Sequence, residues 1–191
     1  YKLRHATDLT ERTRGAPCAA AATFKHTTAR KTMSAVDASA APVTVRNADA
    51  RDLPAILALL ARQFDEHDIA LAPADLERSV RTLLDEPRLG HVLVACADGA
   101  DGAVMGVAVL SFLFTLEHGG PGAWLDELYV AEPQRGRGVG ALLVDAALRV
   151  ARARGCVALD LEVEAGHGPA ERLYERLGFL RHRRVRWVRR L

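Results

Sequence analysis

The feature that constrains this sequence most is a strand that enters a glycine-rich loop and continues directly into a helix. Residues 125–130 (LDELYV) have the pattern of a strand, glycines follow at positions 136, 138 and 140, and apolar residues then recur at helical spacing over 138–154. Glycines let the backbone come close to a ligand, and the first amides of a helix attract anions. The segment therefore predicts an anion site suited to a pyrophosphate, with Arg135 and Arg137 adding positive charge.

Two nucleotide-binding patterns compete for this loop, beside a plain helix start that binds nothing. Gly136-x-Gly138-x-x-Ala141 also matches the dinucleotide fingerprint, and Asp160 stands about 20 residues later, where a ribose-binding acid is expected. Only about 30 residues follow Asp160, however, and these are too few for the remaining strands of a dehydrogenase. No Gly-Lys-Ser/Thr follows the glycines, which excludes a P-loop.

The rest of the sequence alternates strand and helix patterns. Expected strands cover 42–48, 91–97, 103–114, 123–130, 156–163 and 179–191, and expected helices cover 49–64, 74–86, 138–154 and 169–178. Asp49 suits the N-terminal cap of the first helix, whereas Gly155 and Gly178 suit the ends of the last two. This order predicts an α/β (α+β) domain with a central sheet.

Composition narrows the class of protein further. A length of 191 residues allows one domain, and we expect it to span 43–191 after a disordered Ala/Thr/Ser/Arg-rich tail over 1–42. No apolar run approaches the roughly 20 residues that span a bilayer. The net charge of only +2 gives no general case for nucleic-acid binding. Three cysteines without CxxC spacing argue against a disulfide framework or a zinc site, and favour a reducing, cytoplasmic location.

Two motifs together resemble the GNAT superfamily of N-acetyltransferases. Arg135-x-x-Gly138-x-Gly140 is similar to the acetyl-CoA signature of that family, LDELYV to the strand that precedes it, and ERLYERLGF, which contains Tyr174, to its late helix motif. The resemblance covers about residues 43–191. It implies a central mixed, mostly antiparallel sheet flanked by helices, acetyl-CoA as co-substrate, and transfer of the acetyl group to an amine.

The resemblance also implies which residues contact acetyl-CoA. Backbone groups of Leu128, Tyr129 and Val130 would hold the pantetheine arm. The pyrophosphate would lie on the following loop and helix start, which comprise Arg135, Gly136, Arg137, Gly138, Val139, Gly140 and Ala141. His167 stands where the family often has Asn, two residues before the proline of the late helix, and we expect His167 and Ala170 to contact the cofactor from that side.

Acetyl transfer needs a base to deprotonate the amine and an acid to protonate the departing thiolate. By resemblance Tyr174 is the acid, and its alternative is a core aromatic. Asp126 and Glu127 are the candidate bases, and as neighbours on a strand they should face opposite sides unless a bulge intervenes. Strand parity places Asp126 with Leu128 towards a helix-covered face. Similar diamine and aminoglycoside acetyltransferases carry an acid at this position, so we favour Asp126 over Glu127.

The sequence says less about the site of the acceptor amine than about the site of acetyl-CoA. The acidic stretch 64–68 suits a cationic amine of a small molecule or peptide, with Glu66, His67 and Trp124 as candidate contacts. His67 and His118 lack metal-ligand spacing, so no metal is expected.

Other functions compete with this reading. The basic end RHRRVRWVRRL could serve a nucleic-acid or ribosome-binding module, although an edge strand is favoured, and a non-catalytic acetyl-CoA-binding regulator is a third alternative. A homodimer is one possible assembly, and the sequence leaves the oligomeric state open. Cys96 and Cys156 are expected to be core residues of apolar strands.

Overall fold

The computed structural model describes residues 42–97 and 99–189. The predicted tail over 1–42 lies outside the described residues, apart from its last residue. The strands are β1 (Val43–Asn47), β2 (Gly90–Ala97), β3 (Val104–Thr115), β4 (Gly120–Val130) and β5 (Ala158–Leu161). The helices are α1 (Leu53–Glu66), α2 (Pro73–Asp85), α3 (Val139–Ala153) and α4 (Gly168–Arg176), with short 3₁₀ turns η1 (Ala50–Asp52) and η2 (Glu132–Gln134).

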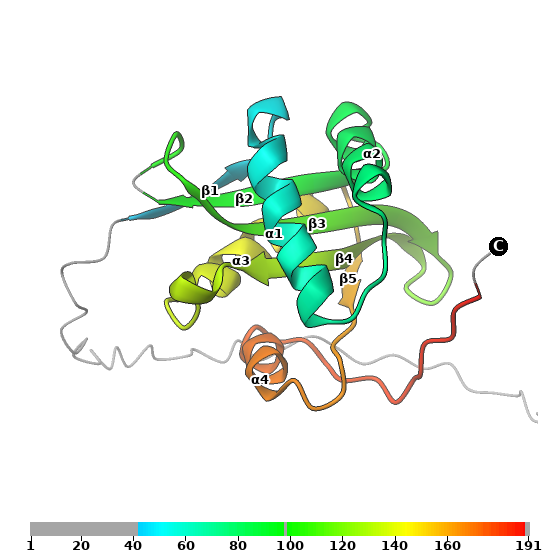
Figure 1. The fold of residues 1–191 in the computed structure, drawn as a ribbon. Helices are drawn as coiled ribbons and strands as arrows, with labels where there is room; N and C mark the ends of the chain where they lie inside the picture. The colour runs from blue at the N-terminus through cyan, green and yellow to red at the C-terminus, as the bar shows by residue number, and fades with distance from the viewer. Residues whose placement is uncertain (1–41, 98, 190–191) are drawn as a thin grey trace, which may run out of the picture. The chain divides into compact units, whose positions relative to one another are not determined.

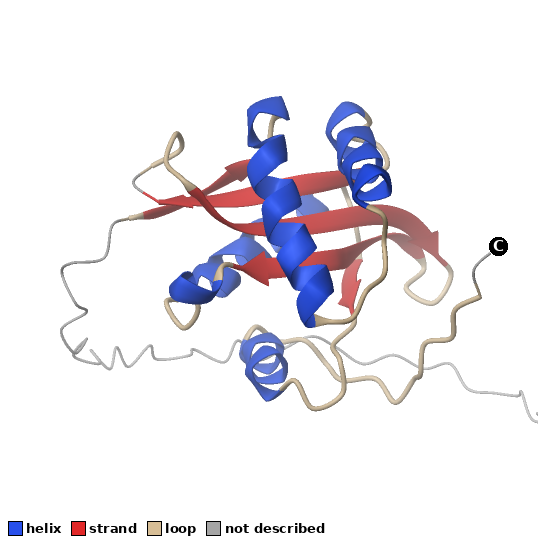
Figure 2. Ribbon diagram, viewed as in Figure 1, coloured by secondary structure: helices blue, strands red, loops and turns tan. Residues whose placement is uncertain are grey.

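The five strands form one sheet in the order β1-β2-β3-β4-β5. The first four pair antiparallel, while β4 and β5 pair parallel after the crossover through α3. The sheet is drawn in red in Figure 2, with helices on both of its faces. The predicted mixed, mostly antiparallel sheet flanked by helices is therefore confirmed.

Each face of the sheet has its own apolar core. On one face α1 and α2 pack on β2 and β3 through residues such as Ile56, Leu60 and Val107. On the other face α3 packs through Leu143 and Ala147, among others. Figure 1 shows α1 and α2 in front of the strands and α3 behind them. Strands covered on both faces explain why β2 and β3 read as continuous apolar runs.

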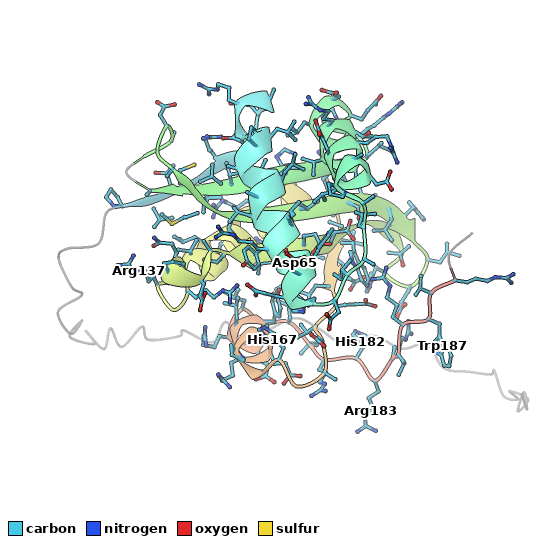
Figure 3. The ribbon with its side chains drawn as sticks, in the orientation of Figure 1. Asp65, Arg137, His167, His182, Arg183 and Trp187 are labelled. Atoms are coloured by element: carbon cyan, nitrogen blue, oxygen red, sulfur yellow. The ribbon has the colours of Figure 1, made fainter. Side chains whose placement is uncertain are left out.

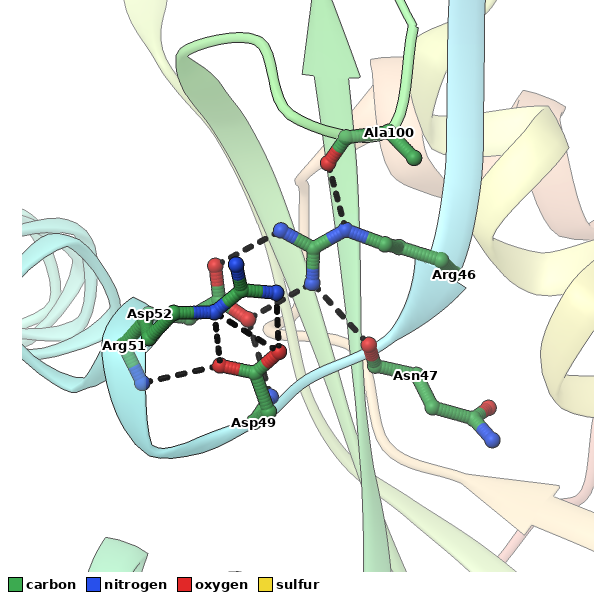
Figure 4. Close-up of polar contacts among 6 residues, drawn as sticks. All are labelled: Arg46, Asn47, Asp49, Arg51, Asp52 and Ala100. Carbon is green, nitrogen blue, oxygen red and sulfur yellow. Dashed lines mark hydrogen bonds and ion pairs between the residues drawn. The ribbon is translucent and has the colours of Figure 1, made fainter.

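The link from β1 into α1 is fixed by charge. The Arg46 guanidinium makes a bidentate pair with Asp52 at 2.6 and 2.8 Å and also donates to the carbonyl of Ala100 (Figure 4). Asp49 caps the turn by accepting from the Arg51 amide, and the Asp52 side chain accepts in return from the Asp49 amide. The predicted cap at Asp49 is thus confirmed, and Asp52, which is buried, has its charge compensated by Arg46.

The end of the chain departs from expectation. Residues 179–189 form no strand, and Val185, Trp187 and Val188 are 78%, 91% and 82% exposed, so the alternation of Arg with apolar residues gains no buried face. Arg184 pairs with Glu117 at 2.6 Å and Arg186 with Glu162 at 2.8 Å instead. The predicted edge strand over 179–191 is therefore wrong for its described part.

The predicted strand over 156–163 is shorter than expected. β5 keeps only four residues, Ala158–Leu161, and Cys156 is half-buried just before it rather than inside a strand. Cys96 does lie buried in β2, as expected. Within the described ranges, no helix is both long and apolar enough to cross a membrane.

Candidate active site

The loop between β4 and α3 has the geometry of an anion site. Gly136 (φ +76°) and Gly138 (φ +84°) both adopt the left-handed conformation, which side chains with a Cβ rarely adopt. Gly138 is the N-cap of α3, and no side chain of the described residues caps this end of the helix. Gly140 differs, because a Cβ there would only touch Leu173 of α4 at 3.5 Å.

Arg135, at the start of this loop, is held by the protein itself. Its Nε donates to the Val130 carbonyl at 2.9 Å, and its terminal nitrogen donates to both carboxylate oxygens of Glu66 at 2.9 and 2.8 Å. Tyr129 donates its hydroxyl to the same carboxylate at 2.6 Å and lies under the guanidinium. Hydrogen bonds from Tyr129 and Arg135 lower the pKa of Glu66. Glu66 therefore holds the start of the loop between β4 and α3 in place, and its carboxylate is already neutralised by Arg135.

Arg137 has fewer contacts than Arg135. Its guanidinium donates to Gln134 Oε1 at 2.7 Å and is exposed, beside the start of α3 (Figure 3). Gln134 is neutral, and no carboxylate of the described residues pairs with Arg137, so its charge is free to pair with an anion.

Strand β4 contains a bulge at the two acidic residues. Val109 of β3 faces Glu127, whereas the next residue, Leu110, faces Leu125, so Asp126 is the extra residue on β4. The bulge reverses parity along the strand: Ala123 and Leu125 pack in the α3-side core before it, and Leu128 and Val130 do so after it.

This reversal changes where the two acids point. Tyr129 packs in the core under α1 and α2, and Glu127 shares its parity beyond the bulge. The parity argument from sequence, which grouped Asp126 with Leu128 on one regular strand, is therefore wrong. Glu127 is directed to the α1 side of the sheet.

Beyond the bulge, β4 has an open edge. Pairing with β5 covers only Gly122–Leu125. The Ala131 amide donates to the Met105 carbonyl at 2.9 Å, and with this register the backbone of Tyr129 faces β3 while that of Leu128 and Val130 faces the other way. The Val130 carbonyl accepts from Arg135, and within the described residues β5 does not pair with the backbone of Leu128 or Val130.

Glu127 is half-buried and has one strong partner. Gln63, on α1, donates from Nε2 to Glu127 Oε2 at 2.6 Å. Burial, followed by the charge of neighbouring Asp126, raises the pKa of Glu127 to about 7. Burial also raises the pKa of Asp126, although that residue is exposed overall and its carboxylate stays closer to solvent. Of the two acids, Glu127 has the pKa suited to exchanging a proton near neutral pH.

Tyr174 lies on α4 within the α3-side core. Its ring meets Phe179 edge-on at 5.5 Å, in the same cluster as Leu128 and Val130. Burial raises the pKa of its phenol to about 12. The phenol is thus protonated at neutral pH but is a weaker acid than a solvated tyrosine.

The start of α4 is occupied by its own cap. His167 Nδ1 accepts from the Ala170 amide at 3.2 Å, and the same amide also donates to the His167 carbonyl. His167 and His67 lie near each other, with ring centroids 6.1 Å apart, so the end of α1 meets the start of α4 (Figure 3). His67 also contacts Glu164 at 3.0 Å. The contacts predicted from His167 and Ala170 to the cofactor would have to replace this cap.

Trp124, the remaining predicted acceptor residue, is half-buried on β4. It lies opposite Ser111 of β3 and beside Asp160 of β5. Asp160 contacts His118 at 2.8 Å, which ties the β3–β4 turn to β5. In the part of the chain that the structure describes, no three His, Cys, Asp or Glu side chains form a metal-binding group.

Sequence reasoning missed Gln63. It occupies the next turn of the apolar stripe formed by Leu53, Ile56, Leu59 and Leu60, and it is only 8% exposed. A polar residue at a core position of an amphipathic helix was the available signal, because buried polar groups need partners.

Comparison with known proteins identifies the family of this chain. Residues 53–179 match the sequence model of the acetyltransferase (GNAT) family. The chain is 30% identical over 145 residues to an L-methionine sulfoximine/L-methionine sulfone acetyltransferase of Pseudomonas aeruginosa, which covers 71% of this chain and 79% of that protein. Aminoglycoside N(6')-acetyltransferase type 1 of Serratia marcescens is 29% identical over 121 residues, 62% of this chain and 81% of that protein.

Solved structures share the fold. Aminoglycoside N-acetyltransferase AAC(6')-Iy in complex with CoA superposes with a TM-score of 0.68 at 20% identity, over 81% of this chain and 99% of that one. At that identity the likeness concerns the fold alone. Because the family pattern covers residues 53–179 and a relative is 30% identical over most of both chains, this protein belongs to the GNAT family of acetyltransferases.

Proposed function

We propose that this acetyltransferase moves the acetyl group of acetyl-CoA to the primary amine of a small cationic molecule or peptide, with Glu127 as the general base. The observation that carries the proposal is the placement of Glu127: it follows the bulge of β4, faces α1, and has a pKa of about 7. Relatives named for acetylating methionine sulfoximine and aminoglycosides support an amine acceptor.

The cofactor fits the open features of the site. The pyrophosphate would accept hydrogen bonds from the uncapped amides that follow Gly138, with Arg137 contributing charge. The pantetheine amides would pair with the open backbone groups of Leu128 and Val130, so the arm would lie along β4 where β5 no longer pairs. Acetyl-CoA supplies the activated acetyl group, and the protein holds it beside the bulge.

The reaction then needs three proton transfers. An alkylammonium must lose one proton before attack, and Glu127 can take it when ionised, directly or through one water. Attack of the neutral amine on the thioester carbonyl forms a tetrahedral oxyanion with a positively charged nitrogen. That nitrogen gives its second proton to solvent, and the intermediate collapses to the amide and releases the CoA thiolate. Tyr174, protonated at neutral pH, would donate to that sulfur as charge develops. Because its pKa is raised, the phenol gives up its proton to the thiolate less readily than a solvated tyrosine would. We expect Tyr174 to act mainly by donating a hydrogen bond to the sulfur.

Charge favours a cationic acceptor. Asp126 and Glu127 place two carboxyl groups side by side on β4, and Asp126 stays exposed. Since Arg135 already neutralises Glu66, we propose that Asp126, rather than Glu66, attracts the ammonium group. The exposed Asp65 at the end of α1 adds to the negative charge of this side (Figure 3).

One assay tests the proposal. Amino acid derivatives, aminoglycosides, diamines and N-terminal peptides would be screened with acetyl-CoA by detecting the free CoA thiol. On the best acceptor, Glu127→Gln should lower turnover by about 10²-fold or more, the range of general base catalysis. Asp126→Asn should mainly raise KM, and Glu175→Gln, an exposed carboxylate on α4, serves as the control. Full turnover of Glu127→Gln would refute Glu127 as the base.

A further inference from the structure

Gln63 is an unusual residue for the place it occupies. It lies on the buried face of α1, one turn after Leu59 and Leu60, where the pattern calls for an apolar side chain. The only hydrogen bond of its side chain in the described structure is to Glu127, and that bond joins α1 to β4 across 64 residues of sequence.

The contact satisfies only half of the amide. An ionised carboxylate can only accept, so Gln63 must present its NH₂ group to Glu127. Its Oε1 is then left buried with no hydrogen-bond partner among the described residues. A buried acceptor without a partner lowers stability, and replacing it with an apolar group of similar shape can be neutral or stabilising. Packing alone therefore does not explain glutamine at this position.

We infer that Gln63 is a positioning residue for the reaction: its amide holds the Glu127 carboxylate beside the bulge of β4, on the α1 side of the sheet and in its ionised form. The inference rests on the proposed role of Glu127 as the base. It adds a residue of α1 to a site built on β4. It also gives a reason for a glutamine whose partly unpaired amide does not favour folding.

The groups around Glu127 define what the Gln63 contact adds. On its own strand, Asp126 opposes ionisation. From α1 the Gln63 hydrogen bond favours the ionised form, from the turn after α1 His67 does so when charged, and from the C-terminal segment Arg186 does so as well. Gln63 is the one uncharged member of this set, so its loss changes the carboxylate without changing the net charge of the site.

The test compares Gln63→Met with the parent protein in thermal melts at pH 5.5 and pH 8.5. Methionine keeps the length and removes both amide groups. At pH 5.5, where Glu127 is protonated, the variant loses only hydrogen bonding between neutral groups, so its melting temperature should fall little. At pH 8.5 it should be less stable, because the ionised carboxylate has lost its donor. An equal difference at both pH values would overturn the inference, since a packing role does not depend on this titration.

A matched background isolates the contact. When Glu127 is already glutamine, Gln63→Met should give the same change in melting temperature at both pH values. A pH-dependent change in that background would overturn the inference, because it would have to come from another group.

Catalysis provides the second readout. The acid limb of kcat/KM should move up by about one pH unit in Gln63→Met, because the loss of a hydrogen bond to the ionised carboxylate disfavours its charged form. An unchanged limb in an enzyme that still depends on Glu127 would refute Gln63 alone. Full turnover of Glu127→Gln would instead refute the proposed base, and with it any part of Gln63 in the reaction.

Discussion

Replacing Glu127 with glutamine should make the protein more stable at alkaline pH while it removes most of the activity. The side chain is half-buried, the only side-chain hydrogen bond to it among residues 42–97 and 99–189 comes from Gln63, and Asp126 lies next to it. Its carboxylate is therefore held where ionisation is unfavourable. Glutamine has nearly the same shape and cannot ionise, so it removes the charge and keeps the volume.

The size of this stability difference follows from the difference between the pKa of Glu127 in the folded and in the unfolded state. The pKa of Glu127 rises from 4.5 to about 7 on folding, so the folded state binds the proton more tightly than the unfolded state. The stability that this group contributes is complete below pH 4.5 and is lost as the pH rises to about 7. The full difference would be about 3 kcal/mol, and partial solvent exposure reduces it to about 1 to 2 kcal/mol.

Thermal melts of the parent and of Glu127→Gln between pH 4.5 and 8.5 would measure this difference. For a chain of this size, 1 to 2 kcal/mol corresponds to roughly 3 to 6 °C in Tm. The two curves should coincide at the acid end and separate at the alkaline end, with the variant higher. The exposed Glu175→Gln should show no such separation. Coincident curves at pH 8.5 would show that Glu127 ionises freely, and would remove the physical basis for its role as a base.

Three further predictions concern other parts of the molecule. Gly138→Val should abolish acetyl-CoA binding in calorimetry, whereas Gly119→Val, at an equally left-handed glycine in the β3–β4 turn, should strain the chain without weakening binding; equal losses would reject the loop as the cofactor site. Tyr174→Phe keeps the packing with Phe179, so a fall in turnover of less than about tenfold at unchanged Tm would leave this tyrosine a core residue. Removing residues 1–41 should leave Tm and acetyl-CoA affinity nearly unaltered, since both apolar cores lie within 43–179, and a large loss of either would show that the tail packs.

The fold followed from local patterns because the decisive elements are strongly periodic. The helix after the glycine loop was expected at 138–154 and is found at Val139–Ala153, ended by Gly155 at φ +73°. The hairpin of β2 and β3 was equally evident, since both strands are buried on two faces. The predicted C-terminal strand was wrong because a strand needs the edge of another strand to pair with, and the alternation of Arg with Val and Trp does not show whether such an edge is available. Arg184 and Arg186 instead pair with Glu117 and Glu162, which lie far away in the sequence.

The site was predictable only where function depends on backbone conformation. Glycines at positions 136 and 138 report left-handed geometry directly, so the anion loop could be read from sequence. The choice between Asp126 and Glu127 could not, because a one-residue bulge reverses parity and depends on how β3 and β4 pair across a turn. The use of Glu66 as a brace also required tertiary structure, since its partner Arg135 lies 69 residues away.

The last turns of α1 connect the two halves of the site. Gln63 and Glu66 are three residues apart and therefore lie on the same side of the helix. Gln63 contacts the proposed base on β4, while Glu66 binds Tyr129 on the same strand and Arg135 at the entry to the cofactor loop. A shift of this one helix end would move the carboxylate and the loop together. Residues of α1 therefore contact both the proposed base and the loop that precedes α3, and so fix the position of one relative to the other.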